Sequence, residues 1–260
     1  MGSNKTRWLA VLGAAGAALA LTACGGEAGG AVTDPQSTDG ALLSQSFQLF
    51  KQAPSVRVTA RAAVAMGTRV EITTDRRKNC LADAQNGFFQ AAVEHGGRTW
   101  IRWSDDVLDP ARAISARQTE LSKGLRGKWL ELSDNGRIRK SMVDLCTLAT
   151  VHTIAEQLSQ PGQRAVREDE VNDENGERLA PLRQGEKGNS VTAYVKTDGK
   201  PYPRKIVVDM PTFAPEPVDF LLDAYGDPVS VKPPERSRTV RSEHLEALAE
   251  KELAAGLSSG

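Results

Sequence analysis

Short stretches in the middle of the chain alternate apolar and polar residues, which is the pattern of β-strands with one buried face. The clearest stretch is 56–64, where Val56, Val58 and Val64 alternate with arginine and threonine. Glycine-containing turn signals separate the stretches that follow, so consecutive strands are expected to pair antiparallel. The pattern recurs four times directly afterwards, at residues 68–74, 78–84, 88–94 and 98–104.

The second half of the chain adds more strand candidates. Asp198-Gly199 forms the tip of one hairpin, because an Asp-Gly pair favours a tight turn between two strands. The alternation predicts strands at residues 127–132, 164–170, 177–183, 190–196, 202–209, 218–222 and 228–231. Together with the first set they predict one antiparallel sheet.

Helical spacing of apolar residues appears at three places. An amphipathic helix is predicted over residues 41–53, where Pro54 ends it, and a second over 143–158. Residues 239–255 carry leucines along one side among many charges, so the tail from 234 to 260 is predicted as a charged segment with a possible helix. Residues 105–127 are polar with a weak helical pattern. Strands with a few helices make this an α+β protein.

Trp100 and Trp103 lie in one predicted strand, three positions apart. An odd spacing places two side chains on opposite faces of a sheet. At least one of the two rings is therefore expected to approach the surface.

The first residues have the anatomy of a secretory signal. Lys5 and Arg7 precede an apolar run, 8–21, that is too short and too rich in glycine and alanine for a stable membrane-spanning helix. The run ends in Leu21-Thr22-Ala23-Cys24, which resembles a bacterial lipobox. That resemblance implies cleavage of residues 1–23 and acylation of Cys24, including palmitate, and hence anchoring at the extracytoplasmic face of a cell membrane. An ordinary cleaved signal with a chance cysteine is the alternative.

Residues 24–40 are small and polar, and they predict a flexible tether between the lipid anchor and the folded domain. The remaining cysteines, Cys80 and Cys146, form an even pair in a compartment where disulfides persist, so we predict a disulfide between them. Two free buried thiols are the alternative. A metal site is not predicted, because the three histidines show no paired ligand spacing.

Charge and motifs narrow the function. Lys plus Arg and Asp plus Glu both number 33, so net charge gives no reason to expect nucleic acid as a partner. A Gly-x-Ser-x-Gly nucleophile motif is absent from the sequence, and no cofactor motif is found, so neither enzymatic activity nor a cofactor is predicted.

The closing segments, 196–208 and 223–233, resemble the final hairpin and last strand of the LolA and LppX/LprG-like group of bacterial envelope lipoproteins, and the disulfide pair resembles its actinobacterial members. The order of elements from 41 to 233 is similar as well. This resemblance implies a curved antiparallel sheet that forms an incomplete β-barrel, covered by a few helices, with an apolar cavity. It also implies a lipid or lipoglycan ligand, and no set of catalytic residues.

The predicted function is an anchored lipoprotein that binds a lipid or another amphiphile for transport or sensing. The alternative is a non-catalytic interaction module of the same fold that docks a protein partner in the envelope. Periodicity shows only which face is apolar, so the candidate cavity residues could equally form an ordinary core. The candidates are Val56, Val58, Val64, Val70, Ile72, Phe89, Val93, Ile101, Trp103, Leu130, Leu132, Val191, Val195, Ile206 and Val208.

Overall fold

The computed structural model describes residues 38–62, 69–84, 88–158, 164–212, 214 and 216–258. The predicted signal, the lipidation site Cys24, most of the predicted tether and Val64 lie outside the described residues. Within the described part, no helix is both long and apolar enough to cross a membrane.

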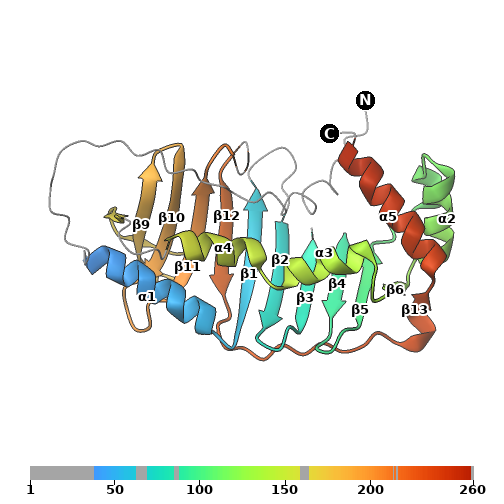
Figure 1. The fold of residues 1–260 in the computed structure, drawn as a ribbon, viewed down its shortest axis with the longest axis horizontal. Coiled ribbons are helices and arrows are strands. Elements are labelled where there is room, and N and C mark those ends of the chain that lie inside the picture. Colours follow the sequence, from blue (N-terminus) through green and yellow to red (C-terminus); the bar gives the residue numbers. More distant parts are fainter. Residues whose placement is uncertain are drawn as a thin grey trace.

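One large sheet forms the framework (Figure 1). Its strands are β1 (Ser55–Ala62), β2 (Arg69–Asp75), β3 (Cys80–Ala84), β4 (Phe89–Val93), β5 (Thr99–Trp103), β6 (Trp129–Glu131), β7 (Val166–Arg167), β8 (Val171–Asn172), β9 (Arg178–Glu186), β10 (Asn189–Lys196), β11 (Pro203–Asp209), β12 (Val218–Asp223) and β13 (Thr239–Arg241). Their order is β13-β6-β5-β4-β3-β2-β1-β12-β11-β10-β9-β7, with β8 also on β9. The N-terminal and C-terminal halves of the sheet thus meet where β1 pairs with β12.

The sheet is curved and open, and its two end strands, β13 and β7, are not joined to each other. Among the strands that the structure describes, every pairing is antiparallel except that of β13 with β6, which is parallel. The predicted α+β class, with an incompletely closed sheet covered by a few helices, is therefore confirmed, and one parallel pair makes the sheet mixed.

Helices lie across one face of this sheet (Figure 1). The helices are α1 (Thr38–Gln52), α2 (Ala116–Leu125), α3 (Arg137–Cys146), α4 (Ala149–Leu158) and α5 (Glu243–Ser258), with short 3-10 turns η3 (Pro110–Arg112) and η4 (Arg236–Arg238). Helix α1 lies over β10 and β11, α4 follows it towards the middle of the sheet and α3 lies over β2–β4, whereas α2 and α5 pack together at the β6 end. Leu43, Phe47 and Phe50 recur at helical spacing on α1, and this spacing is why that helix buries one side.

Strand register brings the apolar residues of many strands onto the face beneath the helices. Val58 lies opposite Ile72 of β2 on one side and opposite Leu222 of β12 on the other. Ile101 in turn lies opposite Leu130. Since residues directly opposite each other in a sheet share a face, these pairs form continuous apolar rows.

Two predicted elements are wrong. The helix predicted over 143–158 is two helices, because the chain turns at Thr147 and Leu148, where Leu148 has a φ of +52° that no α-helix contains. The strand predicted over 228–231 is not a strand, since this segment has no ladder partner. Of the strand predicted over 164–170, only Val166–Arg167 is a strand, namely β7.

Both tryptophans of β5 are buried, so the expectation that one approaches the surface is wrong. Trp103 is on the inner face, 5.8 Å from the ring of Phe89, and Trp100 is on the outer face with only 2% exposed. The guanidinium of Arg98 lies 5.1 Å from the Trp100 ring centroid, and the neighbouring Ala92 is small and also buried. This part of the outer face is therefore covered as well.

The C-terminal segment is part of the fold. After β12 the chain runs past the ends of the strands to β13, and α5 then packs on α2 (Figure 1). The α5 carboxylates accept backbone hydrogen bonds around the start of α3: Glu250 from the N–H of Arg137 at 2.6 Å, and Glu246 from the N–H of Ser133 at 3.0 Å. Gly136, at the N-cap of α3, has no side chain to do this itself. The folded part thus continues past residue 233.

The predicted disulfide is present. Cys80 and Cys146 are bonded with their Cα atoms 5.7 Å apart, and both side chains are buried. The bond joins the start of β3 to the end of α3, so it fastens the helical layer to the sheet.

Removing this bond is expected to destabilise the protein by about 4 kcal/mol, because a crosslink spanning 66 residues restricts the unfolded chain. Urea unfolding of the double variant Cys80→Ala/Cys146→Ala measures the loss. Wild-type protein under reducing conditions should reproduce it. A loss below about 1 kcal/mol in both would contradict the role of the bond.

The cap that α5 supplies to α3 gives a second prediction. Glu250→Ala removes the acceptor for the Arg137 N–H and is expected to lower the free energy of unfolding by about 1 kcal/mol, the usual effect of losing a cap. Lys251→Ala, at the next and exposed position of the same helix, is the control and should change little. Equal effects of the two variants in urea unfolding would show that the cap is not stabilising.

Candidate functional site

The predicted cavity residues share the helix-covered face of the sheet. Thirteen of the fifteen are buried, Val70 is half-buried against the same core, and Val64 lies outside the described residues. Side chains from the helices, among them Phe47 of α1 and Met142 of α3, belong to the same cluster. The residues therefore form a packed core, and their role in lining a ligand cavity stays a prediction.

This core reaches the surface at one pocket of about 200 Å³. The pocket lies between the end of α1, the β1 and β2 strands, the turn after β2 and the α3–α4 junction. Its apolar lining includes Phe50, Val56, Cys146 and Leu148, which are also members of the core cluster. The floor of the pocket is thus the core itself, and the disulfide borders it.

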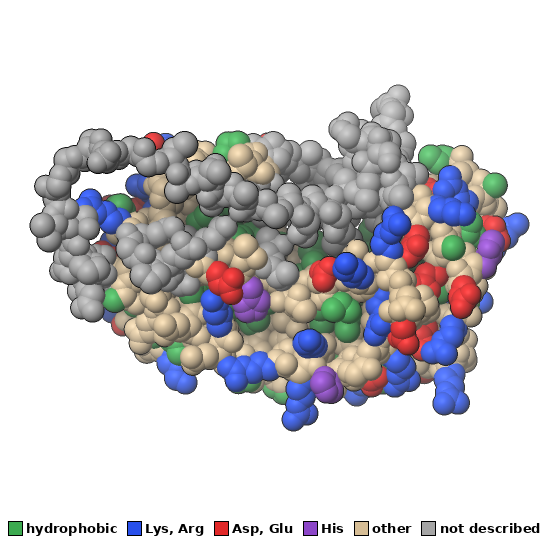
Figure 2. All heavy atoms as spheres, viewed as in Figure 1, with side chains coloured by type: hydrophobic (Ala, Val, Ile, Leu, Met, Phe, Trp, Pro, Cys, Tyr) green, Lys and Arg blue, Asp and Glu red, His purple; other side chains and the backbone are tan. Residues whose placement is uncertain are grey.

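Basic side chains line the same pocket. Lys51 comes from the last turn of α1, and Arg76 and Lys78 come from the turn between β2 and β3. Figure 2 shows basic side chains spaced along the lower edge of the face that carries the helices. We name Lys51, Arg76 and Lys78 the basic rim.

The acidic groups near the pocket are engaged. Asp75 accepts hydrogen bonds from the backbone N–H and the side-chain amide of Asn79, both at 2.9 Å. Glu156 lies 3.5 Å from the ammonium of Lys51, and Arg76 donates to the carbonyl of Gln52. Three cations against the single lining carboxylate leave the pocket with a net positive charge.

Unusual backbone conformations gather here too. Among the described residues, positive φ outside glycine occurs at Lys78 (68°), Leu148 (52°) and Ala224 (50°), and the first two line the pocket. The left-handed region is unfavourable for residues with a Cβ, and it persists only where the surroundings enforce it. The pocket is therefore built from locally strained chain on two of its sides.

His152 of α4 completes the lining and contacts Phe50, with 5.0 Å between the ring centroids. Burial lowers the pKa of His152 below its ordinary value, and the nearby charge of Lys51 lowers it further, against a smaller opposite effect of Glu156. The neutral imidazole is thus favoured, and it presents a ring face together with Phe50.

A second pocket, of about 390 Å³, is polar and lies at the opposite part of the sheet, around β8, β9 and β10. Its charges pair with one another: Arg178 with Asp198 at 2.9 Å, and Lys196 with Glu177 at 2.5 Å. It therefore presents paired rather than excess charge.

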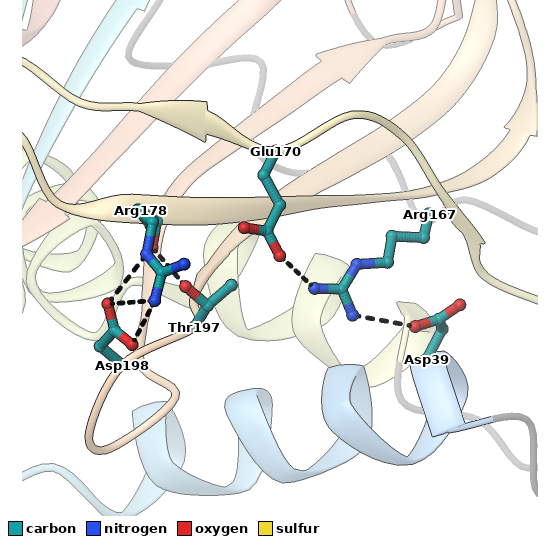
Figure 3. Close-up of polar contacts among 6 residues, drawn as sticks. All are labelled: Asp39, Arg167, Glu170, Arg178, Thr197 and Asp198. Atoms are coloured by element: carbon teal, nitrogen blue, oxygen red, sulfur yellow. Dashed lines mark hydrogen bonds and ion pairs between the residues drawn. The ribbon is translucent and has the colours of Figure 1, made fainter.

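Nearby, Arg167 of β7 links two elements (Figure 3). It lies 2.7 Å from Glu170 and 3.5 Å from Asp39 in the first turn of α1. Only the Asp39 contact joins the edge of the sheet to α1, and at 3.5 Å with both side chains partly exposed it contributes little to stability.

Sequence reasoning identified the apolar face and the disulfide but missed the basic rim and His152. The run Arg76-Arg77-Lys78, which ends at the first residue of the strand predicted over 78–84, was the available signal, although a charged turn is usually only solvated. Lys51 and His152 join it through folding, from helices that are distant in the chain. Among the described residues, no three His, Cys, Asp or Glu side chains come together as metal ligands would.

No protein-family model matches the sequence, and no curated protein matches it. The crystal structure of the lipoprotein LppX from Mycobacterium tuberculosis is similar over 77% of this chain and 100% of its own, at 13% identity and a TM-score of 0.48. LprF from Mycobacterium bovis is similar over 76% of this chain and 97% of its own, at 12% identity and a TM-score of 0.49. LppX belongs to the group that the sequence resembles, and at these identities the likeness concerns the fold alone.

The lowered pKa of His152 predicts a pH dependence. Below the ordinary value of 6.5 the unfolded chain takes up a proton that the folded protein resists, so the stabilisation is complete above that pH and is lost as pH falls through the folded pKa. Urea unfolding should show that wild type loses more stability than His152→Gln over this range. His95→Gln, at an exposed position, is the control, and the same pH profile for both variants would rule out burial of His152 as the cause.

Proposed function

We propose that this protein binds an amphiphile at the pocket beside the disulfide, with the apolar part of the ligand against the floor and its polar part at the rim. The observation that carries the proposal is the floor itself: Phe50, Val56, Cys146 and Leu148 belong at once to the pocket and to the core. Burial of a ligand's apolar carbons there contributes about 0.8 kcal/mol for each methylene.

The volume of the pocket limits the length of acyl chain that it can hold. At about 200 Å³ it is smaller than the 300 Å³ or more of ordinary ligand sites. It therefore suits part of one acyl chain rather than several complete chains. A longer chain would require the helices α1, α3 and α4 to separate from the sheet, and the α3–α4 junction at Leu148 is where the helical layer is already interrupted.

The N-terminal sequence supports the same proposal. Acylation of Cys24, as its lipobox implies, would hold the domain at the outer face of a cell membrane, where amphiphiles are concentrated. A domain kept close to the bilayer by the tether that the sequence predicts over residues 24–40 would reach the membrane surface readily. Transport and sensing would both use such binding.

Filling the pocket tests the proposal. In full chain carrying Cys24→Ser, to prevent acylation, Ala53→Phe places a ring in the lining and is expected to weaken binding of a fluorescent fatty-acyl probe about tenfold or more. Ala111→Phe, at an exposed position in η3, is the matched control and should bind as before.

Circular dichroism and thermal unfolding verify that both variants are folded. Absence of probe binding by the unsubstituted protein, or equal binding by the two variants, would contradict the proposed site. Mass spectrometry of organic extracts from the purified protein provides an independent readout of bound amphiphile.

A further inference from the structure

We infer that the pocket selects amphiphiles with an anionic headgroup, phosphate-bearing lipids above all, and that the basic rim is its specificity element. This inference rests on the proposed function, and it adds the chemical class of the ligand. It comes from the placement of Lys51, Arg76 and Lys78 around an apolar floor.

The geometry fits one headgroup approached from several sides. Lys51 is on the α1 side of the pocket, whereas Arg76 and Lys78 are on the sheet side, in the turn after β2. An anion seated between them would meet cations from both layers. Lysine and arginine donate to phosphate oxygens through charge-assisted hydrogen bonds, which are stronger than those between neutral groups.

Competing charges do not cancel this preference. Asp75, the acidic residue of the lining, has both carboxylate oxygens engaged by Asn79. Glu156 contacts Lys51 at 3.5 Å on the exposed side, a distance and setting at which an ion pair is weak. A headgroup phosphate that accepts a hydrogen bond from Lys51 would therefore replace only a weak ion pair with Glu156.

The strained residue Lys78 adds an independent observation. Its φ of +68° is a conformation in which glycine or asparagine is favoured, yet a lysine occupies the position. Lysine there has a cost in stability, and the gain that we assign to it is a cation at the rim. The same turn donates the Lys78 N–H to the Asp75 carbonyl at 2.9 Å, so its shape does not depend on the lysine side chain.

Titration calorimetry with two lysolipids of equal chain length tests the inference, again in full chain carrying Cys24→Ser. Lysophosphatidylglycerol, which is anionic, is expected to bind about tenfold more tightly than zwitterionic lysophosphatidylcholine, below their micelle concentrations. The triple variant Lys51→Gln/Arg76→Gln/Lys78→Gln should reduce this ratio to about twofold while it retains lysophosphatidylcholine binding.

A matched control removes the same charge elsewhere. Arg117→Gln/Lys123→Gln/Arg126→Gln neutralises three exposed cations on or next to α2, outside the pocket, and should keep the tenfold ratio. Raising the salt concentration should reduce the preference of the wild-type protein, because salt screens exposed charges.

Lys78→Gly separates binding from folding. It is expected to raise the urea midpoint by relieving the positive φ, and yet to lower the preference for the anionic lipid. If Lys78→Gly lowered both the urea midpoint and the preference for the anionic lipid, the role of the lysine would be structural, and its place in the basic rim would be contradicted.

The outcomes distinguish the two proposals. Equal affinity of the wild type for both lysolipids would overturn the inference and leave amphiphile binding intact, whereas binding of neither would overturn the proposed function. Inorganic phosphate serves as the probe that carries the anionic phosphate but no acyl chain. If it bound as tightly as lysophosphatidylglycerol, the site would be one for free phosphate and the lipid assignment would be wrong.

Discussion

The packing of a single helical layer against the apolar face of an open sheet is the interaction on which the rest of this structure depends. Antiparallel register places Val58, Ile72 and Leu222 in neighbouring positions of one face, and similar pairs extend the face towards both ends of the sheet. Because the sheet does not close on itself, that face has no second sheet to cover it. Amphipathic helices α1, α3 and α4 take this role, and the hydrophobic effect holds them there.

Helices that cover a broad sheet leave edges, and the pocket lies at one of these edges. The disulfide holds the end of α3 on β3, and the chain must then turn sharply at Leu148 before α4 begins. This turn, the end of α1 and the turn after β2 surround a place where core side chains meet solvent. The same covalent bond that stabilises the fold therefore shapes the proposed binding site.

The far end of the sheet is stabilised differently. There β13 and α5 return from the C-terminal end of the chain, and α5 carboxylates accept the backbone N–H groups around the start of α3. Since α3 leads through Cys146 to the pocket, the C-terminal helix supports the site from a distance. A segment that is rich in charge thus serves the interior of the fold, through side chains such as the buried Glu246.

The sequence by itself determined the longer strands, the apolar face and the cysteine pair, but it did not predict the short strands β8 and β13, and the strand predicted over 228–231 does not form. Alternation such as that of Val56 and Val58 has one structural solution, and Cys80 and Cys146 are the only two cysteines outside the segment that resembles a lipobox, so the predicted disulfide could join only these two. It did not determine that Trp100 is buried, because burial on the outer face depends on what packs there. Nor did it show the break at Leu148 or the packing of α5 against α2. Leu148, Glu246 and Ala249 are only 3%, 5% and 2% exposed, because residues distant in the chain cover them.

Only the tertiary structure brought Lys51, Arg76, Lys78 and His152 around one apolar floor. They come from a helix, a turn and a second helix that lie more than twenty residues apart along the chain, and each of them alone reads as an ordinary surface or helix residue. Periodicity reports which way a side chain points within its own element. The position of one element relative to another depends on packing and register, and these are properties of the folded chain as a whole.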